Sequence, residues 1–168
     1  MDGRAARPAG GASGSRVTQP DREREGKQTV TSTNQDDIRA RNVRTVRTFY
    51  RLQEAMDFER WLELWAEEAG QDIPYAPEGF PTTVRGKANL EGLYRPLFEG
   101  FAEIHIQDLR VDPLNDPNRV LVRWHTHGPL KNGGLYENDL VGVFEFGEDG
   151  RITHLTEYLN PQKVNIHP

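Results

Sequence analysis

One carboxylate lies inside a largely apolar stretch near the end of the chain. Glu157 belongs to residues 150–161, which follow the hairpin-turn signal Glu148-Asp149-Gly150. The large apolar side chains of this stretch are Ile152, Leu155, Tyr158 and Leu159. Burying a lone carboxylate is costly unless it finds a partner or water. We therefore predict that Glu157 is a general acid/base in the last strand of a sheet, with a solvent-facing glutamate at a sheet edge as the alternative.

Two histidines offer this carboxylate a partner in proton transfer. His125 and His127 are two residues apart in a predicted strand, so they share one face of it. We expect one of them to line a ligand cavity and the other to lie near its rim, and we assign His125 as the second catalytic residue. With His105 and His154 they have the ligand types of a metal site, but no second spacing motif supports one, and no metal is expected.

Aromatic and amide side chains are candidates for binding a planar substrate. The aromatic candidates are Trp65, Tyr75, Tyr94 and Trp124. The alternative for these residues is core packing, which is favoured for Trp65. Tyr136 and Asn138 could donate hydrogen bonds to a substrate carbonyl or enolate, with cross-strand pairing in the sheet as the alternative.

Composition divides the chain of 168 residues into a tail and one domain. Residues 1–35 contain few large aliphatic side chains and are predicted to be a disordered N-terminal tail, because such a stretch buries too little surface to offset its ordering entropy. The tail carries a net charge of +2 against −5 for the whole chain, so residues 36–168 carry −7. A nucleic-acid-binding domain would present a basic face, and that function is excluded.

Other sequence features bear on compartment and partners. The chain has no cysteine, which excludes disulfides and thiolate metal sites. It shows neither an apolar signal region near the N-terminus nor a run long enough to cross a bilayer, so no membrane association is expected and a cytoplasmic location is predicted.

The periodicity of the apolar residues changes along the chain. A long amphipathic helix is predicted from Asp36 or Asp37, and a short helix with its own apolar stripe includes Phe58 and Trp65. A short strand, a loop and a third helix ended by Pro96 follow. The predicted elements after the first helix cover residues 58–65, 70–75, 87–95, 101–111, 119–127, 135–146 and 150–161. Gly142 within the third long strand predicts a bulge or sharp curvature.

Helices followed by an antiparallel meander predict an α+β fold. We expect a cone-shaped, curved antiparallel sheet wrapped around three N-terminal helices. The open mouth of such a cone can hold one small ligand. The outward face of the sheet, to which we assign Val141, Val143 and Ile152, is apolar enough to suggest a homodimer.

The order of these elements resembles the nuclear transport factor 2-like superfamily. Within it, several stretches are similar to the SnoaL-like polyketide cyclases and the phenazine-biosynthesis A/B proteins. These stretches are Trp61–Glu67, Val84–Lys87, Tyr136–Asn138, Gly150–Ile152 and Glu157–Pro161. The similarity covers roughly residues 36–161 and is more specific for the fold than for a reaction.

The resemblance implies a small, cofactor-free enzyme of secondary metabolism. It would act by acid/base proton transfer on a cyclic or polyketide-like metabolite, as a cyclase, isomerase or dehydratase. In both families an acid seven residues after the turn glycine transfers the proton, and counting from Gly150 leads to Glu157. The histidine that the phenazine proteins carry on the third helix is replaced here by Leu93 or Tyr94. The alternatives are a non-catalytic module that binds a small molecule or a partner, and an epoxide hydrolase.

Overall fold

The computed structural model describes residues 22–164, with side chains from residue 34 onward. Of the predicted disordered tail, residues 1–35, the first 21 lie outside the described residues, whereas residues 22–35 are helical. The first helix, α1 (Arg22–Glu54), begins well before the predicted start at Asp36. No proline interrupts its 33 residues, whereas Pro20 lies just before it. None of the helices within the described residues is long and apolar enough to cross a membrane.

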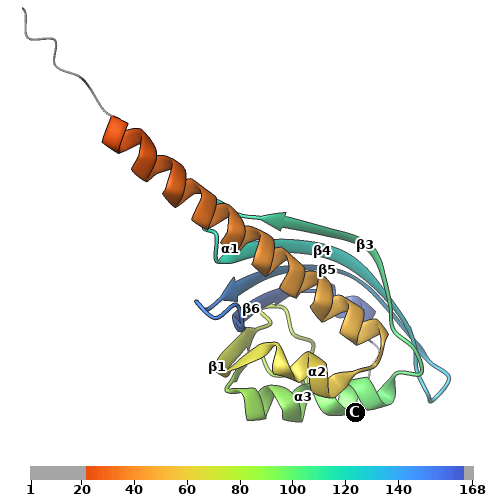
Figure 1. The fold of residues 1–168 in the computed structure, drawn as a ribbon. Helices are drawn as coiled ribbons and strands as arrows, with labels where there is room; N and C mark the ends of the chain where they lie inside the picture. Colours follow the sequence, from red (N-terminus) through yellow and green to blue (C-terminus); the bar gives the residue numbers. More distant parts are fainter. Residues whose placement is uncertain (1–21, 165–168) are drawn as a thin grey trace, which may run out of the picture.

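Six strands form one curved sheet that does not close into a barrel (Figure 1). They are β1 (Trp65–Asp72), β2 (Thr83–Arg85), β3 (His105–Pro113), β4 (Arg119–Pro129), β5 (Leu135–Phe146) and β6 (Ile152–Tyr158). Their spatial order is β2-β1-β6-β5-β4-β3. All neighbouring strands are antiparallel except β1 and β6, which run parallel. The predicted α+β cone is confirmed.

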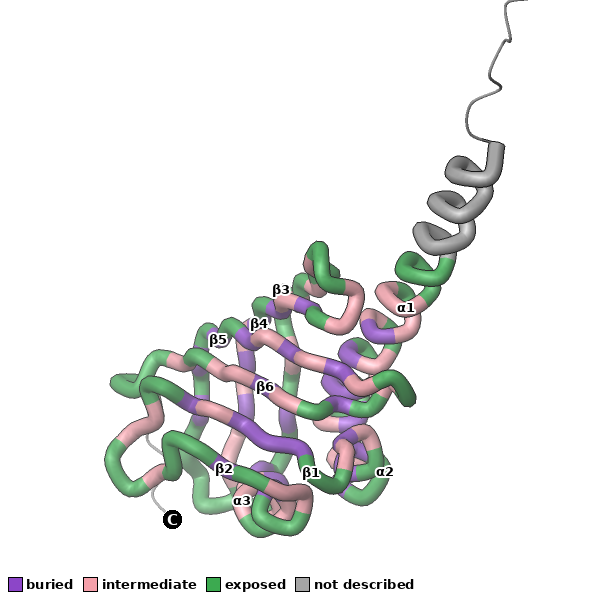
Figure 2. Tube along the Cα trace, turned by 90° about the vertical axis from the view of Figure 1, so that its left-hand side faces the viewer, coloured by how far each residue is buried: buried purple, intermediate pink, exposed green. Residues whose placement is uncertain are grey.

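The helices cover one face of this sheet. The helix α1 crosses β3 and β4, while α3 (Lys87–Gly100) packs on β1 (Figure 1). Between them lies α2 (Phe58–Glu63), whose N-cap is Asp57, since its carboxylate accepts a hydrogen bond from the Arg60 amide. A single turn, η1 (Pro161–Lys163), follows β6. The inner face of the sheet is thus enclosed, and Figure 2 shows buried residues along it.

Alternation along β5 separates an inner face from an outer one. Its inward residues are Tyr136, Asn138, Leu140, Gly142, Phe144 and Phe146, all buried. Their partners on β6 continue the inner face, with Phe144 opposite Leu155 and Gly142 opposite Glu157. Ile152 was assigned to the outer face and is instead fully buried, because a register irregularity at Phe146 pairs it with an inward residue.

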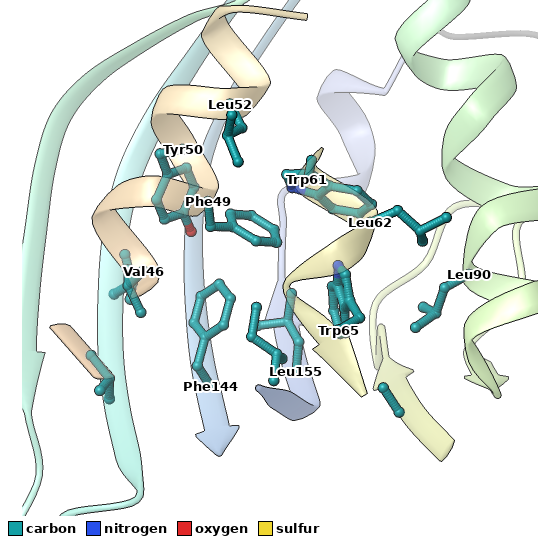
Figure 3. Packing of buried hydrophobic residues seen from close by; sticks show 14 of the residues in the cluster. Val46, Phe49, Tyr50, Leu52, Trp61, Leu62, Trp65, Leu90, Phe144 and Leu155 are labelled. Carbon is teal, nitrogen blue, oxygen red and sulfur yellow. The ribbon is translucent and has the colours of Figure 1, made fainter. Parts of the chain in front are cut away.

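An aromatic cluster fills the space between α1, α2 and the sheet (Figure 3). Phe49 contacts Trp61, Trp65 and Phe144, with ring centroids 5.0, 6.0 and 5.1 Å away. Neither tryptophan side chain is exposed. Such pairs stabilise a core beyond simple burial of area.

Several element boundaries differ from the prediction, and packing or pairing explains two of them. The first strand begins at Trp65 rather than residue 70, because Trp65 pairs with Ile152 and the Leu64 carbonyl accepts the Ile152 amide at 2.9 Å. The third helix continues through Pro96 to Gly100. A proline inside a helix removes one backbone hydrogen bond, but here the next turn places Phe98 against Phe58 and Trp61, with centroids 5.0 and 5.3 Å apart. Packing of this buried ring outweighs the lost bond.

Candidate active site

A cavity of about 130 Å³ lies between α3, the β1–β2 loop and the inner face of β3 to β6. Its wall is mainly apolar. The polar side chains in the wall are Gln53, Tyr94, Thr126, Tyr136 and Glu157. A cavity of about 150 Å³ is known to hold benzene, and this one, at about 130 Å³, is close to the size of a single six-membered ring. A second, outer cavity of about 470 Å³ runs along α3 and shares Phe80, Leu93, Leu97 and Phe101 with the first.

The strand β6 brings Glu157 to this cavity. Its partner on β5 is Gly142. The strand pairing at Gly142 is regular, without the predicted bulge. The glycine serves close packing instead: a Cβ atom at this position would lie 3.1 Å from Leu155 and 3.3 Å from the Trp124 ring. Trp124 therefore lies flush against β5 beside Glu157, and its indole nitrogen donates to the Thr126 hydroxyl at 3.1 Å.

Burial raises the pKa of Glu157 to about 7. The side chain is partly exposed, which is consistent with its place in the cavity wall. No cation borders the cavity among the described residues to stabilise the charged form. A carboxyl with a pKa near 7 is present in both protonation states at neutral pH, so it can accept a proton and return it.

Three tyrosines lie close enough to sense the charge of Glu157. Burial, and then the Glu157 charge, raise the pKa values of Tyr50, Tyr94 and Tyr136. Tyr94 comes from α3 and donates to the Gln71 side-chain oxygen at 2.5 Å. Tyr136 comes from β5, and its hydroxyl remains protonated because its pKa is raised. The site therefore pairs a proton acceptor with phenolic hydrogen-bond donors.

Three of the predicted binding residues line the cavity: Tyr94, Trp124 and Tyr136. The other three do not, and those predictions are wrong. Trp65 is fully buried in the core, and Tyr75 is 61% exposed and contacts Tyr158 instead. Asn138 is fully buried and exchanges two hydrogen bonds with the backbone of Asn160, at 2.9 and 3.0 Å. Its amide fixes the segment that follows Glu157 rather than a ligand.

The structure does not bring His125 to Glu157. Strict alternation in β4 directs Trp124 and Thr126 inward, so His125 lies on the outer face of the sheet. There its Nδ1 is 2.9 Å from the Asp139 carboxylate. His127 likewise pairs with Glu137 at 2.9 Å. The prediction that His125 is the second catalytic residue is wrong, and Glu157 is the only predicted catalytic residue within the cavity.

Several residues around the cavity were missed by sequence reasoning. Thr126 could have been found, since it shares a strand face with Trp124. Gln53 lies at the end of α1, and Leu97 lies beyond Pro96, where the helix was expected to have ended. Gln71 had no signal, because a polar residue in a short strand is more often exposed; it is fully buried here, and its amide nitrogen has no partner among the described residues.

The raised pKa of Glu157 predicts a specific pH dependence of stability. The folded protein keeps a proton that the unfolded chain releases near the ordinary value of 4.5, so the contribution of this group to stability falls as the pH rises from about 4.5 to about 7. The difference of about 2.5 pKa units corresponds to about 3 kcal/mol. We expect Glu157→Gln to be up to about 3 kcal/mol more stable than wild type at about pH 8, with a much smaller gain at about pH 5.

Urea unfolding of both proteins at the two pH values measures this difference. Taking the difference between variant and wild type removes the contributions of other groups, such as Asp72, whose pKa is lowered by its bonds to Arg85 and Thr83 despite the opposing effect of burial. A gain that does not change with pH would show that Glu157 has an ordinary pKa in the folded protein.

Residues 46–155 match the family model of the SnoaL-like domain. The Bacillus subtilis (strain 168) protein YesE is 32% identical over 124 residues, which cover 71% of this chain and 82% of YesE. The phenazine biosynthesis protein PhzB of Pseudomonas fluorescens is 27% identical over 132 residues, covering 76% of this chain and 80% of PhzB.

Solved structures agree with the sequence comparisons. The crystal structure of a putative isomerase from Bacillus subtilis superposes with a TM-score of 0.68 at 29% sequence identity. The match covers 74% of this chain and 90% of that one. The resemblance to SnoaL-like and phenazine-biosynthesis proteins in the sequence is confirmed, and the chain belongs to the SnoaL-like family.

Proposed function

We propose that the protein is an enzyme that moves a proton on a small cyclic carbonyl compound, as an isomerase or cyclase of secondary metabolism does. The observation that carries this proposal is the place of Glu157: a carboxyl with a pKa near 7 in an apolar cavity with room for one ring. The comparisons support a role in secondary metabolism, because the relative PhzB is a protein of phenazine biosynthesis.

The reaction has two proton transfers through one carboxyl group. The Glu157 carboxylate removes a proton from the carbon next to the carbonyl group, and the electron pair of the C–H bond moves into an enolate. The protonated Glu157 then returns the proton. Return to the same carbon restores the starting compound, and return to a conjugated carbon shifts a double bond. The carboxylate is regenerated, so the cycle consumes no other reagent.

Tyr136 is the residue that stabilises the enolate oxygen in this proposal. Its side chain lines the cavity, and its hydroxyl keeps its proton because burial and the Glu157 charge raise its pKa. A donor that is already in place stabilises negative charge as it develops, since it needs no reorganisation during the reaction. Tyr94 is a weaker candidate, because its hydroxyl donates to Gln71 in the free protein.

Deuterium exchange separates this enzyme from a binding module with the same cavity. A β,γ-unsaturated cyclohexenone is a suitable probe, because it has one ring, an acidic C–H and no charge. We expect the protein to catalyse exchange of the α-proton with D2O and conversion to the conjugated ketone, which NMR follows directly. Binding of the probe without exchange would favour the non-catalytic module. The epoxide hydrolase alternative has less support, because no aspartate lines the described cavity.

We also propose that the protein forms a homodimer through the outer face of the sheet. Val141 and Tyr158 are 37% and 39% exposed there, and the exposed Tyr75 adjoins Tyr158 with ring centroids 5.9 Å apart. Apolar and aromatic surface of this kind is typical of an interface. Sedimentation should give about twice the chain mass of 19.2 kDa.

The variant Val141→Glu should shift this dimer to the monomer, because it replaces an exposed apolar side chain of the proposed interface by a charge. Lys131→Glu changes an exposed residue of the β4–β5 turn and serves as the control. A wild-type protein that remains monomeric at micromolar concentration would contradict the dimer.

A further inference from the structure

The described wall of the cavity contains an acid but no basic side chain. Its ionisable side chains within the described residues are Glu157, Tyr94 and Tyr136, none of which is ever positive. Gln53 from α1, Thr126 from β4 and the apolar residues of β3 contribute no charge. The described wall therefore offers hydrogen-bond donors but no positive charge that could form an ion pair with an anionic ligand.

Cations of the surrounding elements are held elsewhere by carboxylates. On α3, Arg95 pairs with Glu59 at 2.9 Å and Glu91 at 2.6 Å and stacks over the Phe58 ring. Next to β1, Arg85 of β2 pairs with Asp72 at 2.8 Å. Neither arginine borders the cavity. Each would have to leave its carboxylate partner to turn toward it.

The sheet and the segment after it show the same arrangement. His125 of β4 and Lys163 of η1 share Asp139, at 2.9 and 3.5 Å. His154 of β6 pairs with Asp72 at 3.1 Å, and these histidines lie on the outer face. The arginine, lysine and histidine side chains named here thus each pair with a carboxylate outside the cavity.

We infer that the cavity takes uncharged ring compounds, and that a carboxylated ring can enter only together with a proton. The inference deepens the proposed function, on which it rests, by naming the substrate class of the same site. The substrate would be a neutral ketone, ester or amide with an acidic C–H. A ring acid would have to be esterified or amidated before it reached this enzyme.

The reason is that two carboxylates in one small apolar cavity cannot both stay ionised. Like charges at close range disfavour each other, and a pair of acids in such a place shares one proton. A ligand carboxylate could bind beside protonated Glu157 with a hydrogen bond between them. Above the pKa of Glu157 each bound anion must then bring one proton, so its affinity must fall as the pH rises.

Benzamide and benzoate are a matched pair for testing this charge selection. They have the same shape and one ring, and they differ in charge at neutral pH. NMR titration of the full-length protein at about pH 6, 7 and 8 gives both dissociation constants. We expect the dissociation constant of benzoate to rise about fivefold from pH 7 to pH 8, on the way to the limiting tenfold per pH unit for uptake of one proton, while that of benzamide changes by less than about threefold.

The variant Glu157→Gln removes the acid that must be protonated. In this variant benzoate should bind with little pH dependence, and at about pH 8 at least about tenfold tighter than in wild type. Glu145→Gln, on the outer face beside Arg119, should leave the wild-type slope unchanged.

Equal binding of benzoate and benzamide by wild type at about pH 8 would overturn the inference, and this measurement does not depend on whether the variant folds. Failure of the charge selection can be told apart from failure of the proposed function. Deuterium exchange with the neutral ketone would still occur if only the charge selection were wrong, and would be absent if the protein were not an enzyme.

Discussion

Replacing Glu157 by glutamine should lower turnover of the β,γ-unsaturated cyclohexenone by about 10²–10⁴-fold, the usual contribution of a positioned acid/base. The amide has nearly the same shape but cannot accept a proton at neutral pH. Ligand affinity should hold or improve, because the neutral amide costs less to bury than the carboxylate. The expected loss therefore falls on kcat, with little change in KM.

The control for this variant is Glu145→Gln. It makes the same chemical change on the same sheet, at an exposed ion pair with Arg119 that contributes little to stability. We expect its kcat to equal that of wild type. If both variants retain full activity, proton transfer must belong to another group, and the role assigned to Glu157 fails.

Replacing Tyr136 by phenylalanine should lower kcat by about 10²–10³-fold, the effect of removing one donor to a developing oxyanion. The ring, which packs against Phe101 with centroids 5.9 Å apart, is retained. Steady-state kinetics with the same ketone measures the loss. Tyr94→Phe is the matched comparison, since it removes a hydroxyl that already donates to Gln71.

A larger loss in Tyr94→Phe than in Tyr136→Phe would reverse the assignment of the oxyanion donor. A further readout separates catalysis from packing: Tyr136→Phe should keep the pH dependence that Glu157 imposes while its plateau rate falls. A merely structural defect would lower the melting temperature of the variant along with its rate.

The fold could be predicted from the sequence because its signals are local. The change of apolar periodicity predicted helices followed by an antiparallel sheet, and the turn at Gly150 marked the start of the last strand. Glu157 itself stood out as a carboxylate in an apolar strand. These features depend on period and turn chemistry, which a single sequence displays.

One wrong prediction broke a local rule, and the others concerned contacts made by residues far apart in the chain. His125 and Trp124 were both assigned to the cavity, although adjacent residues of a strand point to opposite faces of the sheet. The extent of α3 depends on packing of Phe98 against α2, which outweighs the local signal of Pro96. Asn138 holds Asn160, 22 residues away, and no spacing in the sequence reveals such a bond.

The most direct test of the account is the pH dependence of α-proton exchange in the cyclohexenone, measured by NMR in D2O for wild type and Glu157→Gln. If Glu157 is the base, the wild-type rate should rise with pH, bend near the pKa of about 7 and then stay level, because only the carboxylate removes the proton. The variant should show a low rate without this bend. A bend near 7 that persists in Glu157→Gln, or a wild-type rate that does not change with pH, would contradict the central claim.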